Sequence, residues 1–221
     1  MFNLFKKKEA PKPVITPRDM LFGDMPLSEW PKDENTTGLP WETFIQARNQ
    51  IDAGDKKSAI ANLQKITEMP ELEPRHYLQA WHVLRSLGVN PPADKAKIVY
   101  GVVIEVGMPK GFDLLAAYTD FNAHYLNYSG AGTIWLHPDN SLDAEIDALL
   151  KAGQVVANQI GPWEQPHPSA PTNGNVRLNM LTPSGLHFGE GGFNVLSRDP
   201  MGASLINPAT ALMLKLTKLK K

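Results

Sequence analysis

The spacing of the apolar residues changes near Ile98, and this change limits the possible folds more than any other feature of the sequence. From Trp41 to Leu87 the apolar residues recur every three or four positions, which is the period of a helix with one buried face. After Ile98 they form short β-branched or alternating runs, which is the pattern of strands. The sequence therefore predicts a helical region at 38–97, followed by an α+β domain at 98–221.

Proline, glycine and aspartate mark the expected ends of the helices in the first region. Proline suits the first turn of a helix, where its missing N–H has no partner anyway. An aspartate can cap a helix start through its side-chain oxygen, and a glycine can adopt the left-handed conformation that follows a helix end. We therefore expect helices between Pro40 and Gly54, between Asp55 and Pro70, and between Pro74 and Gly88.

The second region combines strands with two helices. We expect Asn140 or Ser141 to cap a helix whose apolar face ends at Ile160, and Asn207-Pro208 to open a terminal helix. Because strands are grouped with strands, and separate helices cover them, the pattern favours a mainly antiparallel sheet with two flanking helices. The expected strands are Val99–Val106, Phe112–Thr119, Ala123–Ser129, Thr133–His137, Val176–Met180 and Leu186–Phe188.

Residues 1–37 are expected to form an extended or flexible N-terminal arm. They contain five prolines, and proline disfavours helix in the residue before it. The arm also carries apolar residues, which leave open that it docks on the body of the protein. These residues are Met20, Leu21, Phe22, Leu27 and Trp30.

Composition excludes several classes of function. The net charge of -1 gives no sign of the basic surface that binds nucleic acid. The chain has no cysteine, which rules out disulfides, thiolate catalysis and cysteine-ligated metals. It also lacks an apolar run approaching the ~20 residues of a membrane span. We therefore expect a cytoplasmic protein without nucleic-acid or membrane partners.

Two parts of the chain resemble known proteins. Asp113-Leu-Leu-Ala-Ala-Tyr, Tyr125-Leu-Asn-Tyr-Ser-Gly and Leu181-Thr-Pro-Ser-Gly-Leu-His-Phe-Gly resemble segments of an uncharacterised family of bacterial proteins, over about 98–215. This resemblance implies a bacterial source and no particular activity. The helices at about 41–88 resemble a tetratricopeptide hairpin. They cover one and a half repeats, whereas a solenoid needs about three.

The glycine-rich loop at 183–192 contains the one set of residues that suggests covalent catalysis. Ser184, His187 and Glu190 are the residue types of a nucleophile, its base and the group that orients the base. The alternative is a plain β-turn, because no Gly-x-Ser-x-Gly elbow surrounds Ser184, and in a strand His187 would point away from its neighbours. Neither this loop nor the second glycine-rich stretch, at 129–132, has the lysine or the fingerprint of a nucleotide site, so no cofactor is expected.

Other polar residues have simpler interpretations. Histidines and carboxylates do not recur at the spacing of a metal site, so no metal is expected. Glu105 lies in an apolar strand, where burial can raise the pKa of a carboxyl and suit it to acid–base chemistry. A pair with Arg177 on a neighbouring strand, or an outward orientation, is the interpretation that we favour for Glu105.

The aromatic residues are candidates either for the core or for a contact surface. Exposed tyrosine and tryptophan give a large contact area at low entropic cost. Tyr77 and Trp81 on the third helix, with Tyr125 and Tyr128 in the strand region, are the candidate binding residues. The sequence favours a non-catalytic protein-interaction or accessory factor, whose partner is another protein. The alternative is a small-molecule-binding protein or an enzyme that uses the 183–192 loop.

Overall fold

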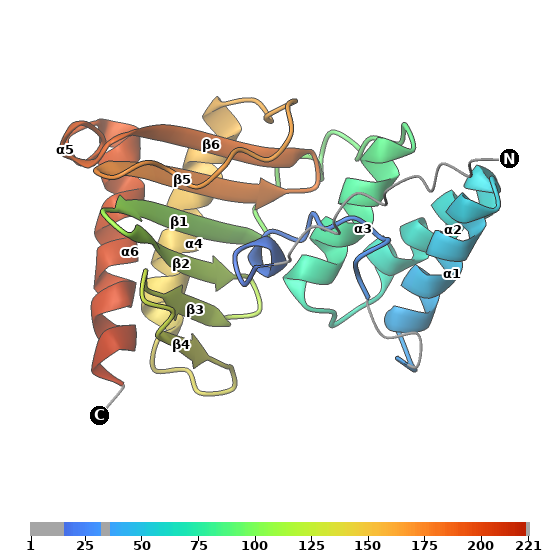
Figure 1. Ribbon diagram of the computed structural model, residues 1–221, viewed down its shortest axis with the longest axis horizontal. Helices are drawn as coiled ribbons and strands as arrows, with labels where there is room; N and C mark the ends of the chain where they lie inside the picture. Colours follow the sequence, from blue (N-terminus) through green and yellow to red (C-terminus); the bar gives the residue numbers. More distant parts are fainter. Residues whose placement is uncertain (1–15, 32–35, 220–221) are drawn as a thin grey trace, which may run out of the picture.

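The computed structural model describes residues 16–31 and 36–219, and it confirms the α+β class (Figure 1). A group of three helices stands beside an antiparallel sheet of six strands, which carries two long helices on one face. The helices are η1 Asp19–Leu21, α1 Trp41–Asp52, α2 Lys56–Glu68, α3 Pro74–Ser86, α4 Asp143–Gln159, α5 Phe193–Leu196 and α6 Pro200–Lys218. The strands are β1 Gly101–Met108, β2 Gly111–Tyr118, β3 Ala123–Leu126, β4 Gly132–Trp135, β5 Asn175–Thr182 and β6 Gly185–Gly192.

The first three helices follow the boundaries that the sequence predicts. The side chain of Asp55 caps α2 by accepting a hydrogen bond of 3.1 Å from the Ser58 amide. Pro74 stands at the first position of α3, where a missing N–H costs nothing. Their shared core includes Phe44, Ala47, Leu63, Ile66, Ala80, Trp81 and Leu84.

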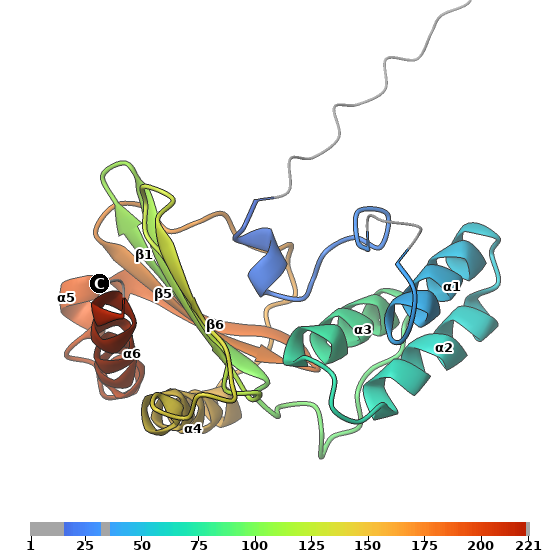
Figure 2. The same ribbon diagram turned by 90° about the horizontal axis from the view of Figure 1, so that it is seen from below.

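The sheet has the order β4-β3-β2-β1-β5-β6, and every neighbouring pair is antiparallel. Figure 2 shows α4 and α6 together on one side of it. Gly153 allows α4 to approach the sheet closely, because a Cβ at this position would lie 2.5 Å from the Val102 side chain. The main core fills this layer, with Val102, Ile104, Ile146, Leu149, Met180, Leu205, Leu212 and Leu216 among its buried residues.

Residues 16–31, which were predicted as part of an arm, run from the opposite face of the sheet to the helical region. Leu21 and Phe22 are buried against the sheet and α3, and the Tyr118 hydroxyl donates a hydrogen bond of 2.7 Å to the Leu21 carbonyl. The Gln79 side chain pairs with both the amide and the carbonyl of Met25, at 3.0 and 2.6 Å. These residues dock, as their apolar side chains allowed. Residues 1–15 and 32–35 of the predicted arm lie outside the described residues.

Several boundaries in the second region differ from the prediction. Helix α4 begins at Asp143 after Leu142, and no side chain caps it, whereas Asn140 or Ser141 was expected to do so. The segment predicted as a glycine-rich loop forms β6, which pairs with β5 along its whole length. The glycines give no strand pattern of their own, and the backbone hydrogen bonds to β5 hold this segment in the sheet. The terminal helix begins at Pro200, where Asp199 caps the Gly202 amide at 2.8 Å, and Pro208 lies inside it. The apolar face of α6 continues past Pro208, so burial outweighs the one intrahelical bond that proline removes.

Within residues 16–31 and 36–219, none of the helices combines the length and the apolar composition that a bilayer crossing requires.

Candidate functional site

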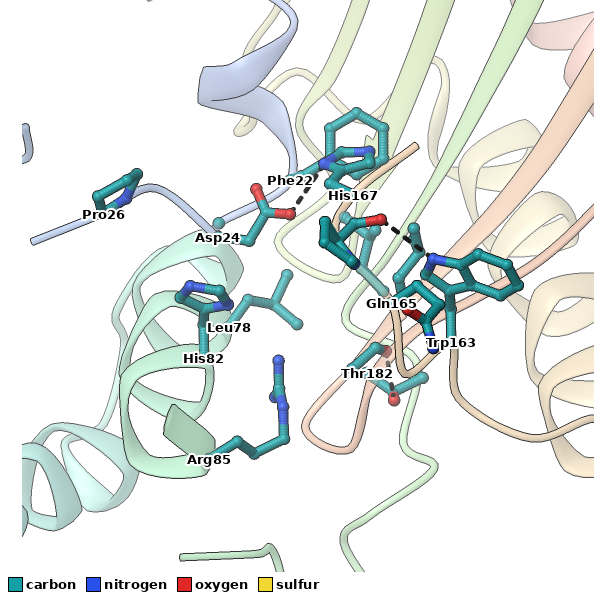
Figure 3. Close-up of a pocket in the computed structure, with 15 residues that line it drawn as sticks. Phe22, Asp24, Pro26, Leu78, His82, Arg85, Trp163, Gln165, His167 and Thr182 are labelled. Atoms are coloured by element: carbon teal, nitrogen blue, oxygen red, sulfur yellow. Dashed lines mark hydrogen bonds and ion pairs between the residues drawn. The ribbon is translucent and has the colours of Figure 1, made fainter. Parts of the chain in front are cut away.

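A cavity of about 380 Å³ lies where four distant segments of the chain meet (Figure 3). The segments are residues 22–26, helix α3, the loop at 163–167 and the hairpin end of β5 and β6. The cavity therefore lies between the helical region and the sheet. Its volume falls within the range of roughly 300–1,000 Å³ that is usual for small-molecule sites.

Helix α3 contributes a stripe of three side chains to the cavity. Leu78, His82 and Arg85 are spaced by four and three positions, which places them on one face of a helix. Figure 3 shows all three side chains on the side of the cavity that α3 forms. A histidine and an arginine thus follow Leu78 toward the C-terminal end of this face of the helix.

Arg85 brings a positive charge to the cavity. Its guanidinium donates a hydrogen bond to the Pro183 carbonyl, which ties α3 to the turn between β5 and β6. Among the described residues, no carboxylate forms an ion pair with Arg85. A guanidinium has five N–H donors in a planar fork, and the Pro183 contact uses one of them. The remaining donors are suited to an anion.

His82 lies one turn before Arg85 on the same face. Burial lowers the pKa of His82, and the positive charge of Arg85 acts in the same direction, whereas Asp24 opposes them. The ring is therefore neutral at pH 7. An anion that bound beside His82 would favour the protonated ring, so this residue can respond to a ligand charge.

Asp24 and His167 form a contact at one end of the cavity. The Asp24 Oδ2 atom lies 2.9 Å from His167 Nδ1, while His167 Nε2 lies 3.3 Å from an Arg18 nitrogen. A guanidinium only donates, so Nε2 accepts and Nδ1 carries the proton that is donated to Asp24. Both ring nitrogens of His167 are therefore engaged within the protein.

The contact to Arg18 continues into a chain of charges on the sheet. Arg18 donates to Glu105 at 2.5 Å and to the Pro168 carbonyl at 2.9 Å. Glu105 is fully buried and also pairs with Arg177 at 3.3 Å, which is one of the two alternatives favoured from the sequence and excludes the outward orientation. Glu105, Arg177 and Arg18 thus fasten residues 16–31 and the 163–168 segment to the sheet. They form the frame of the cavity and lie outside its lining.

The structure brings together two of the three residues of the predicted catalytic set. Ser184 Oγ lies 3.0 Å from His187 Nε2, because the hairpin turn folds Ser184 back toward the strand. Glu190 points to the other face of β6, where it binds Arg177 at 2.6 and 2.8 Å. Two residues three positions apart on a strand face opposite ways, so Glu190 does not orient His187. Burial lowers the pKa of His187, which keeps its ring neutral.

Neither Ser184 nor His187 lines the cavity. His187 faces the α4 side of the sheet and is fully buried, with Lys97 nearby. Ser184 also contacts the Thr182 hydroxyl at 2.9 Å. These hydrogen bonds hold the turn between β5 and β6, which Arg85 also contacts through the Pro183 carbonyl. The role of Ser184 and His187 here is therefore to stabilise the turn.

The four candidate binding aromatics lie in different places. Trp81 is buried inside the helical region, and Tyr77 is half-buried with its hydroxyl bound to the Met69 carbonyl at 2.5 Å. The Tyr125 hydroxyl donates to Asp113 at 2.9 Å, and burial, with Asp113, raises its pKa to about 12. Tyr128 is exposed at the turn between β3 and β4. None of the four lines the cavity.

Sequence reasoning missed Arg85, His82, Asp24 and His167 as a group, because they come from three segments that the fold alone brings together. One signal was available for two of them. His82 and Arg85 share one helical face with Leu78, and this spacing of four and three positions can be seen in the sequence. Among residues 16–31 and 36–219, no three histidine or acidic side chains are arranged to hold a metal ion.

Comparison with known proteins gives no further guide, since the chain matches no protein-family model, no curated protein and no solved structure.

Proposed function

We propose that the protein binds a small anionic molecule in the cavity between α3 and the β5–β6 hairpin. The observation that carries this proposal is Arg85, a guanidinium in the cavity wall with no carboxylate partner among the described residues. Burial favours pairing of such a charge, because an unpaired cation loses hydration without compensation. A carboxylate or phosphate would accept two parallel hydrogen bonds from the guanidinium fork.

The neighbouring residues support the same ligand charge. His82 can take up a proton when an anion binds, which adds a second positive group one helical turn away from Arg85. The acidic side chain of the cavity, Asp24, is already paired with His167 at 2.9 Å. Of the charged side chains in the cavity wall, Arg85 is therefore the one without an ion-pair partner among the described residues.

Binding fits these residues better than covalent catalysis. The Ser184–His187 pair lies outside the cavity, and the Nε2 atom of His167 is engaged by Arg18. A nucleophile needs a base within hydrogen-bond reach and a substrate site beside both groups. The cavity-lining side chains do not combine these features.

The experiment is calorimetric titration of the full chain with benzoate, acetate, phenyl phosphate and inorganic phosphate, and with benzamide as an uncharged control. We expect saturable binding of at least one anion and none of benzamide. Arg85→Gln should weaken the anion at least tenfold, because a hydrogen bond between charged groups contributes about 1.5–3 kcal/mol. The matched control is Arg198→Gln, an exposed arginine outside the cavity, which should bind as the wild type does. Equal loss in both variants, or no anion binding at all, would refute the proposal.

The protein-interaction role favoured by the sequence stays a prediction. The aromatic residues of the third helix that were expected to contact a partner are not free to do so. Trp81 is buried, and the Tyr77 hydroxyl is bound to the Met69 carbonyl before α3. An anion that binds in the cavity would lie against both the helical region and the sheet. An accessory factor could respond to such a ligand through the relative position of these two parts.

A further inference from the structure

Trp163 is the largest aromatic side chain in the cavity wall, and 44% of its surface is exposed. It stands on the side opposite α3, across from His82 and Arg85 (Figure 3). A partly exposed tryptophan in the wall of a pocket offers a large, rigid apolar surface on which a ligand can pack.

The position of Trp163 is fixed by three contacts within the protein. Its backbone amide donates to the Leu186 carbonyl at 2.6 Å, and its indole N–H donates to the Pro166 carbonyl at 3.1 Å. Phe188 packs edge-on against the ring, with centroids 5.2 Å apart. A ring that is held before the ligand arrives loses little conformational freedom on binding, which favours affinity.

The remaining wall of the cavity is mostly apolar. Phe22, Leu78, Leu181 and Leu186 are among the residues that line it. A small inorganic anion would fill only the charged end near Arg85. It would leave this apolar wall and the indole in water.

We infer that the anion bound in this cavity carries a planar aromatic ring that lies against Trp163, with its charged group at Arg85 and His82. This inference rests on the proposed function and narrows the ligand class to aromatic carboxylates or aryl phosphates. The geometry that supports it is the placement of a fixed, exposed indole on one wall and two nitrogen donors on the other.

The test compares pairs of ligands that differ in the ring alone. Benzoate and cyclohexanecarboxylate carry the same charge on rings of six carbons, but one ring is planar and the other puckered. Phenyl phosphate and inorganic phosphate form a second pair, and comparing phenyl phosphate with benzoate distinguishes a phosphate from a carboxylate ligand. We expect benzoate to bind at least about fivefold more tightly than cyclohexanecarboxylate, because stacking on an aromatic side chain contributes about that factor or more.

Two substitutions locate the effect. Trp163→Leu should reduce the ratio of the cyclohexanecarboxylate dissociation constant to the benzoate dissociation constant to about one, while Trp163→Phe should retain most of it. Tyr128→Leu replaces an exposed aromatic residue outside the cavity and should leave the ratio unchanged. Circular dichroism of each variant checks that the fold persists.

The outcomes separate this inference from the proposed function. If both carboxylates bind equally well to the wild type and Arg85→Gln weakens both, the anion site stands and the aromatic ligand class is refuted. A ratio that survives in Trp163→Leu likewise refutes the role of Trp163. If no anion binds, both statements fail.

Discussion

Replacing Glu105 with glutamine removes the negative charge at the centre of the network that fastens residues 16–31 to the sheet. The Glu105 carboxylate is fully buried and accepts from Arg18 at 2.5 Å, Arg177 at 3.3 Å and Asn179 at 3.2 Å. The two arginine side chains are themselves only 11% and 4% exposed. The substitution therefore leaves cations in the interior without their shared counterion, and the new amide group presents N–H donors to other donors.

The expected cost follows from what each arginine retains. Arg177 keeps Glu190 at 2.6 Å, whereas Arg18 keeps only its contacts to the Pro168 carbonyl and to His167. Removing one partner of a buried ion pair typically costs about 3–5 kcal/mol. The low end, about 3 kcal/mol, applies here because Arg177 remains compensated. For a protein of this size this corresponds to a decrease in melting temperature of roughly 6–12 °C.

Urea unfolding followed by far-ultraviolet circular dichroism measures this change in the free energy of unfolding. Glu164→Gln, at an exposed position, is the control and should change it by less than about 0.5 kcal/mol. Glu105→Leu combined with Arg18→Met should be more stable than Glu105→Leu alone, because no unpaired cation then remains at Arg18. A Glu105→Gln protein as stable as the wild type, or a double variant less stable than the single one, would refute the reasoning.

Three further predictions concern the core, the acid stability and the Ser184 turn. Leu212→Ala, in a fully buried position on α6, should lower the free energy of unfolding by about 2–5 kcal/mol in the same urea assay, and a loss near zero would contradict the packing described. Burial lowers the pKa of His124 to about 4, so the unfolded chain takes up a proton first, and stability falls as the pH drops from about 6.5 to 4. His124→Gln should remove up to about 3 kcal/mol of this loss, and unfolding curves at both pH values test it. Ser184→Ala should leave anion affinity within about twofold of the wild type and cost about 1 kcal/mol of stability, whereas lost binding would place Ser184 in the site.

Much of the fold could be predicted because its signals are local. The helices of the first region begin and end at proline, aspartate and glycine, and each of these residues acts within one turn of its own position. The burial of Leu212 and Leu216 follows from their spacing on an apolar helix face. Strand β6 could not be predicted in full, because its glycines carry no pattern and its pairing depends on β5.

The candidate site could not be predicted because its residues are far apart in the sequence. Asp24, Arg85 and His167 meet only after the N-terminal segment docks between α3 and the sheet. That docking depends on Glu105, whose pairing with Arg177 was expected, and on Arg18, whose contact spans 87 positions of the chain. Ser184 and His187, in contrast, are close in the sequence and were predicted in one candidate catalytic set. Their residue types and proximity suggested chemistry, but the strand places Glu190 on the other face.

Nuclear magnetic resonance of the histidine rings gives the most direct test of the claim that the cavity binds an anion. The chain has six histidines, of which His82 and His167 line the cavity while His124 and His187 lie elsewhere. During titration with benzoate at pH 7, we expect saturable shifts of the His82 and His167 ring signals, with His82 moving toward the protonated position. The signals of His124 and His187 should stay in place. Shifts that are absent at His82, or that are largest at His124 or His187, would contradict the central claim.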